Sequence, residues 1–106
     1  MTKLKEYKMF IDGKWINSES GKTFKTLNPE NNKPWAIVPE ASEVDVDNAV
    51  NAAQKAFEGE WPKLMPRERA KYVRKIGEKL RENAELLGKI ETIDTGKLFR
   101  ETNKQA

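Results

Sequence analysis

Apolar residues between Ala70 and Leu87 recur in steps of three and four, and this spacing constrains the fold more strongly than any other feature of the sequence. Residues with this spacing lie on one face of an α-helix. The face consists of Ala70, Val73, Gly77, Leu80, Ala84 and Leu87, with Ile76 beside it. Pro66 suits the first turn of such a helix, because an amide there would have no partner inside the helix. The pattern therefore predicts a long amphipathic helix, which Asn83 or Gly88 could divide into two.

A β-hairpin is predicted for Lys8–Ile16. Asp12 and Gly13 lie between two apolar runs, and Asp-Gly is a preferred pair for type I′ turns because both turn residues need a positive φ. In that register Phe10 faces Trp15 across the ladder, and such an aromatic pair contributes roughly 0.2–1 kcal/mol. We expect this hairpin to serve the fold and not a functional site.

Short strands and further helices accompany these two elements. Strands are expected at Phe24–Leu27 and Trp35–Val38, each followed within two residues by a proline, which cannot donate to a sheet. Ser42 can cap a helix that carries acidic residues in its first turn. The chain is thus predicted to be one small α/β domain, with a hairpin and short strands followed by two or three amphipathic helices. The hairpin and strands cover residues 8–38, and the helices cover about 43–58, 66–95 and 98–105.

The sequence contains neither cysteine nor histidine. Their absence removes disulfides, thiol nucleophiles, imidazole bases and zinc sites built from Cys and His. The serines lie in predicted loops or helix caps, so no nucleophile has a base beside it. A metal site in this chain would use oxygen ligands, which suit hard cations.

Charge and hydropathy point away from nucleic acid and membranes. The net charge is +3, and residues 61–106 carry twelve basic and seven acidic groups. The basic residues alternate with glutamates, and a mixed face of this kind is typical of a solvated helix. No apolar run approaches the roughly 20 residues that a transmembrane helix needs, and the first residues lack an apolar signal core. We therefore expect no nucleic-acid partner, no membrane partner and a cytoplasmic location.

The segment Glu91–Lys97 directly follows the apolar face. If the three-four spacing continues past Leu87, it reaches Glu91 and then Asp94. One interpretation is that the helix has ended or rotated there, so that Asp94 is solvated or caps the helix. The other is that Asp94 is partly buried and meets a cation or backbone donors, because a buried carboxylate needs a partner. The Gly-Lys pair at the end does not complete a phosphate-binding loop, since the other residues of that motif are absent.

Several short motifs follow one another in a distinctive order along the chain. They are Phe10-Ile11-Asp12-Gly13-Lys14-Trp15, Asn28-Pro29, a helix with Val46, Asp47, Ala49, Val50, Ala52 and Ala53, then Trp61, Arg69 and Glu91-Thr92-Ile93-Asp94-Thr95-Gly96-Lys97. This series, from about Met9 to Lys97, resembles the N-terminal segment of the NAD(P)-dependent aldehyde dehydrogenases, whose chains are several times longer. The resemblance implies a fragment of that family's nucleotide-binding domain that lacks the core sheet.

The resemblance also implies an activity for the full-length enzyme. Such enzymes oxidise an aldehyde to a carboxylic acid with NAD or NADP, through attack by a cysteine thiolate and release by a glutamate-activated water. None of the catalytic or nucleotide-contacting residues corresponds to a position in this chain, so we expect the chain alone to be structural, to be inactive and to bind no nucleotide. Its expected partners are the remainder of the enzyme chain and, in the full-length protein, further copies in a homo-oligomer.

One site of the family does correspond to residues of this chain. Many members hold a monovalent cation with backbone carbonyls just before the Asn-Pro pair and with the Asp of the last motif. The resemblance thus implies a Na⁺ or K⁺ site at the carbonyls of Thr26 and Leu27 and the carboxylate of Asp94. A further carbonyl would come from downstream. This implication favours the interpretation in which Asp94 is partly buried.

A second class of function would use the same hairpin and helices. In this alternative the chain is a free-standing protein-interaction module without catalysis, which predicts a cooperative melt and a monodisperse solution state. An enzyme fragment instead predicts exposed apolar faces and self-association, because its helices have lost the sheet they cover.

Overall fold

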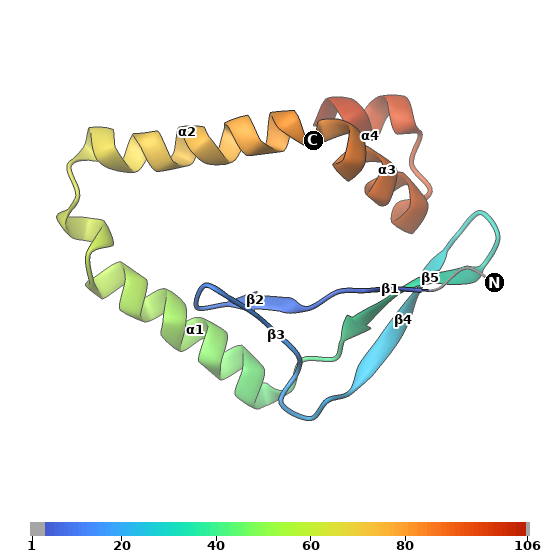
Figure 1. Ribbon diagram of the computed structural model, residues 1–106, viewed down its shortest axis with the longest axis horizontal. Coiled ribbons are helices and arrows are strands. Elements are labelled where there is room, and N and C mark those ends of the chain that lie inside the picture. Colours follow the sequence, from blue (N-terminus) through green and yellow to red (C-terminus); the bar gives the residue numbers. More distant parts are fainter. Residues whose placement is uncertain (1–3, 106) are drawn as a thin grey trace. The chain divides into compact units, whose positions relative to one another are not determined.

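A computed structural model describes residues 4–105. The elements in chain order are β1 (Lys5–Glu6), β2 (Met9–Ile11), β3 (Lys14–Ile16), β4 (Thr23–Asn28), β5 (Lys33–Pro39), α1 (Glu43–Glu58), a 3-10 turn (Trp61–Lys63), α2 (Pro66–Glu82), α3 (Ala84–Thr95) and α4 (Phe99–Gln105) (Figure 1). The predicted α/β class is confirmed. Within residues 4–105, no helix is both long and apolar enough to cross a bilayer.

The contacts divide the chain into two compact units. The first unit, called here the strand unit, takes in the chain up to Thr26 together with Pro34–Lys63. The second, the helical unit, combines Leu27–Lys33 with the chain from Leu64 onward. The end of β4 and the turn after it thus belong with the last three helices, although they are far from them in sequence.

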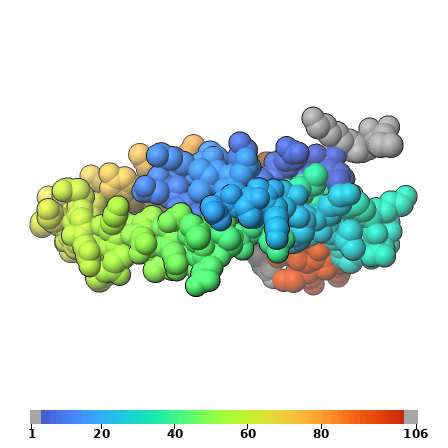
Figure 2. All heavy atoms as spheres, turned by 90° about the horizontal axis from the view of Figure 1, so that it is seen from below, coloured from blue at the N-terminus to red at the C-terminus, as the bar shows by residue number. Residues whose placement is uncertain are grey.

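The predicted hairpin is confirmed as β2 and β3. Asp12 and Gly13 take φ values of 53° and 74°, as a type I′ turn requires. Phe10 pairs with Trp15 in an antiparallel register, and their ring centroids lie 4.8 Å apart. The hairpin lies against α1 within the strand unit, and their surfaces meet in the space-filling view (Figure 2).

The larger sheet of the strand unit has the order β1-β5-β4. Its first strand was not predicted from the sequence, since two charged residues carry no strand pattern of their own. Lys5 and Glu6 pair in parallel with Ala36 and Ile37 of β5. Ala36 is fully buried there, so the short added strand closes one side of the small core.

The helical stretch predicted for residues 66–95 is divided into two helices at Asn83, one of the two positions considered from the sequence. At this residue φ is −109° and ψ is 13°, outside the helical range. Its side-chain amide donates to the Lys79 carbonyl at 2.9 Å, and asparagine competes with helix geometry through bonds of this kind. The last helix begins at Phe99, one residue later than predicted.

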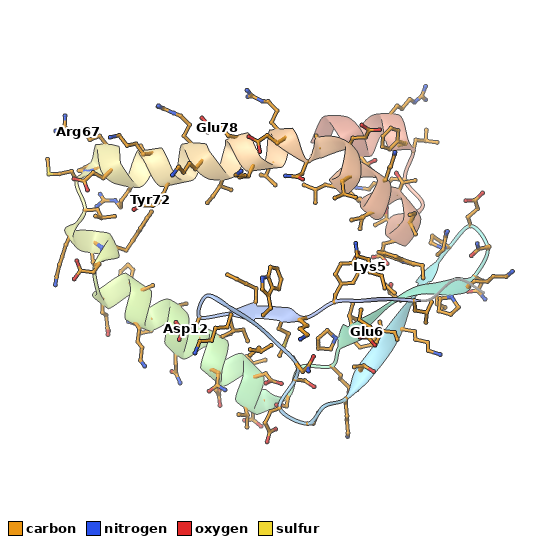
Figure 3. The ribbon with its side chains drawn as sticks, viewed as in Figure 1. Lys5, Glu6, Asp12, Arg67, Tyr72 and Glu78 are labelled. Carbon is orange, nitrogen blue, oxygen red and sulfur yellow. The ribbon has the colours of Figure 1, made fainter. Side chains whose placement is uncertain are left out.

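The apolar face is exposed along its first half. Val73, Ile76 and Leu80 are 62%, 61% and 45% exposed on α2. Tyr72, on the same helix, points to a different side from Glu78 (Figure 3). Beyond the break, Ala84 and Leu87 are half-buried and Gly88 is buried. Only the part of the face on α3 therefore finds a partner among the described residues.

Candidate functional site

The two strand residues predicted as cation ligands lie near the end of β4. Thr26 is half-buried and Leu27 is exposed. In the sheet order, β4 has one neighbour only among the described residues, so it is an edge strand. Successive carbonyls of a strand point to opposite edges. Whichever way the register runs, one of these two carbonyls therefore faces away from the sheet.

The predicted carboxylate ligand, Asp94, lies in the last turn of α3. Its side chain is exposed, whereas Ile90 and Glu91 are half-buried. This agrees with the interpretation in which the core face has rotated and Asp94 is solvated, and it differs from the partly buried carboxylate that the resemblance favoured. The cation ligand set itself stays a prediction.

Leu27 and Asp94 belong to the same compact unit. Helix α3 ends at Gly96, which has φ 80° and donates its N–H to the Thr92 carbonyl at 2.9 Å. A Cβ atom placed on Gly96 would lie 3.2 Å from Cγ of Pro29. The turn after β4 therefore touches the end of α3 directly.

The segment that closes α3 is held by its own hydrogen bonds. The Thr95 hydroxyl donates to the Glu91 carbonyl at 2.7 Å and accepts the Lys97 N–H at 3.3 Å. Nζ of Lys97 lies 3.6 Å from the Glu91 carboxylate. Both groups are more than a third exposed, so this ion pair contributes little to stability. Its effect is to hold the Glu91 side chain against the residue that follows the helix end.

A shallow hollow of about 610 Å³ lies beside the Gly96–Pro29 contact. It is lined by Pro29, Glu30, Thr92, Thr95 and Gly96–Phe99. Its walls offer two threonine hydroxyls, the Glu30 carboxylate and the Lys97 ammonium group, and neither a cysteine nor a histidine. Among the described residues, no three His, Cys, Asp or Glu side chains gather in a way that could hold a metal ion. A cation here would thus rely on backbone carbonyls as well as a carboxylate.

Among the described residues, the Asp45 carboxylate has several hydrogen-bond partners, whereas the sequence indicated only that it lies in the first turn of a helix. It is 2% exposed and accepts the Ser42 N–H at 2.9 Å and the Glu19 N–H at 3.1 and 3.2 Å. The Ser42 N–H, aided by Glu19, holds the pKa of Asp45 below its ordinary value of 3.8, against the opposing effect of burial. The Ser42-x-x-Asp45 pattern before an apolar run signals the cap, but the loop partner Glu19 has no sequence signal.

The sequence model of the aldehyde dehydrogenase family matches residues 15–106. An aldehyde dehydrogenase of Aspergillus niger is 47% identical over 84% of this chain and 18% of its own length. The aldehyde dehydrogenase family 2 member C4 of Arabidopsis thaliana is 44% identical over 94% of this chain and 20% of its own.

Solved structures agree with these relatives. The NAD⁺ complex of a Bacillus cereus aldehyde dehydrogenase superposes with a TM-score of 0.90 at 40% identity, over 94% of this chain and 21% of that one. An NAD-dependent aldehyde dehydrogenase from Sinorhizobium meliloti gives a TM-score of 0.91 at 33% identity, over 96% of this chain and 21% of that one. The chain therefore spans about a fifth of the length of the relatives it matches.

Proposed function

Because the chain belongs to the aldehyde dehydrogenase family, we propose that it forms the N-terminal fifth of an enzyme that oxidises an aldehyde to a carboxylic acid with NAD or NADP. The observation that carries this proposal is the continuous match along the chain, from residue 15 to residue 106. The solved Bacillus cereus relative binds NAD⁺, which supports a nicotinamide cofactor for the whole enzyme.

The role proposed for this chain within the enzyme is structural. The chemistry of the family needs a cysteine thiolate, and these 106 residues contain no cysteine. Asp45, the carboxylate with a perturbed pKa, is occupied by the cap of α1 and the Glu19 amide, so it is not available as a general base. The residues that bind nucleotide and substrate are therefore proposed to lie outside this chain.

The remainder of the enzyme chain is the partner we propose for the exposed side of α2. Val73, Ile76 and Leu80 are exposed there, and burying an aliphatic side chain of this size stabilises a protein by about 1.5–3 kcal/mol. Following the family, we propose further that the full-length enzyme is a homo-oligomer that works in the cytoplasm.

A monovalent cation is proposed to bind at the carbonyls of Thr26 and Leu27 and the carboxylate of Asp94. The donor set fits such an ion, because two neutral oxygens and one anionic oxygen balance a single positive charge and all three are hard ligands. The edge position of β4 supports this assignment, since one of the two carbonyls faces away from the sheet. When bound, the ion would link strand to helix and take no part in the reaction.

The proposed activity is tested by measuring aldehyde-dependent reduction of NAD and NADP with two preparations. One is the 106-residue chain, and the other is the full-length enzyme that carries it. We expect turnover with the second preparation only. Turnover by the chain alone would overturn the structural role, and a full-length protein that reduces neither cofactor with any aldehyde would overturn the proposed activity.

The association state in solution distinguishes an enzyme fragment from the alternative, a free-standing interaction module. Exposed apolar residues on α1 and α2, such as Phe57 and Val73, favour self-association of the isolated chain. We therefore expect sedimentation of the 106-residue chain to show association that rises with concentration. A monodisperse monomer with one cooperative melt would support the interaction module instead.

A further inference from the structure

Gly96 and Pro29 are close neighbours within the helical unit. A Cβ on Gly96 would meet Cγ of the proline ring at 3.2 Å and Cβ of that ring at 3.9 Å. A separation of 3.2 Å is tighter than ordinary van der Waals contact, so the ring would have to move if residue 96 carried a side chain. With a side chain at residue 96, the proline ring would have to lie a few tenths of an ångström farther from the end of α3.

Glycine is favoured at residue 96 for a second reason, which does not involve Pro29: the φ of this residue is positive. Gly96 has φ 80°, a conformation that side chains disfavour whatever their surroundings. Gly21 has φ 74° and nothing within 4 Å of its would-be Cβ. Gly96 and Gly21 thus both have a positive φ. Of these two, only Gly96 has another residue close to the position of a Cβ atom. A comparison between them isolates the contact with Pro29.

The contact joins the two chain segments that supply the proposed cation ligands. Leu27 precedes Pro29 by two residues, and Asp94 precedes Gly96 by two residues. All four residues belong to one compact unit. Proline has a fixed φ and the helix end is hydrogen-bonded through the Gly96 N–H. A displacement of the ring is therefore transmitted to the end of β4.

We propose that Gly96 is a positioning residue for the cation site: its missing side chain lets Pro29 pack against the end of α3, and this contact sets the position of the Leu27 carbonyl relative to the Asp94 carboxylate. The proposal rests on the cation binding put forward under the proposed function. A glycine that ends a helix with a positive φ does not by itself position ligands, so this role is additional.

The test uses melting temperatures of the full-length protein in chloride salts of sodium, potassium and choline at equal ionic strength. The parent is expected to melt at a higher temperature in sodium or potassium than in choline. Gly96→Ala is expected to lose most of this cation-dependent difference. Gly21→Ala, the matched control, is expected to melt at a lower temperature in all three salts and to keep the difference.

A second pair of variants covers the case in which Gly96→Ala does not fold. Pro29→Ala removes the ring and is expected to reduce the cation-dependent difference, whereas Pro34→Ala, at an exposed position of β5, is expected to keep it. If the parent shows a difference and both Gly96→Ala and Pro29→Ala retain it in full, the positioning role is overturned while the cation site stands. If the parent melts identically in all salts, the cation site fails, and the positioning role fails with it.

Discussion

The carboxylate of Asp45 accepts the backbone N–H of Glu19, at 3.1 Å to one oxygen and 3.2 Å to the other. Glu19 lies in the loop that follows the hairpin, and Asp45 lies in the first turn of α1. Asp45 also accepts the Ser42 N–H and hydroxyl. One buried side chain therefore fixes both the start of the helix and the loop that leads away from the hairpin.

Replacing Ser42 by Ala should destabilise the protein. The Ser42 hydroxyl accepts the Asp45 N–H at 3.3 Å and completes a reciprocal capping box, and loss of such a cap costs about 1 kcal/mol. Chemical denaturation of Ser42→Ala measures the change, with Ser42→Thr as the variant that keeps a hydroxyl. Equal losses for Ala and Thr would show that the hydroxyl is not what matters.

Stability should decline in acid because of Asp45. Its pKa is lowered in the folded state, so its contribution is present above the ordinary value of 3.8 and is lost as the pH falls through the lowered pKa. Asp45→Asn should be less stable than the parent at neutral pH and should lose less of its stability on acidification. Denaturation across the acid range tests this, with Asp47→Asn on the exposed side of α1 as control. Parallel curves for Asp45→Asn and the parent would contradict the assignment.

The hydroxyl of Thr102 should matter for the pairing of α3 with α4. Thr102 is fully buried, and its Oγ1 lies 2.9 Å from both the Gly88 carbonyl oxygen and the Thr92 hydroxyl. Oγ1 also lies 3.1 Å from the Phe99 carbonyl oxygen, so its one proton has two carbonyl acceptors, and the Thr92 hydroxyl can donate to it. Thr102→Val removes these bonds from a buried position and should cost about 1–3 kcal/mol. Thr95→Val, at an exposed position, should cost less, and equal costs in denaturation would argue against the buried bond.

Gly77→Ala should have opposite effects in the short and the full-length protein. No atom lies within 4 Å of a Cβ placed on Gly77, so in the 106-residue chain alanine should stabilise α2 by about 1 kcal/mol. In the full-length enzyme the proposed covering of α2 leaves less room for the added methyl group. Paired denaturation experiments measure both changes. The same gain in both proteins would indicate that nothing packs on this face.

Local signals predicted much of the fold. The Asp12-Gly13 turn fixed the hairpin because its φ requirement is met by few residue pairs, and Ser42 marked the start of α1 by its hydroxyl. The break at Asn83 was one of two positions considered, since both Asn and Gly weaken a helix. These features depend on residues that are close together in the sequence, so one sequence is enough to predict them.

Features that depend on distant residues could not be predicted in the same way. The strand β1 exists only because Ala36 and Ile37 are beside it, and the Glu19–Asp45 bond joins residues with no shared pattern. The exposure of Val73 and Leu80 was expected for an enzyme fragment, but the three-four spacing alone tells which residues share a face, and not what covers it. For the cation site, the carbonyls of Thr26 and Leu27 came from the resemblance alone, whereas the helical spacing also led to Asp94. The sequence gave no sign of the Gly96–Pro29 contact.

The pairing of β1 with β5 also sets an order of events for a chain that grows from its N-terminus. Lys5 can find Ala36 only after the whole of β2, β3 and β4 has been synthesised, whereas the hairpin between them closes through a turn of two residues. Long loops close more slowly and at a greater entropic cost than short ones. The first strand in the sequence is therefore the last strand to join its sheet.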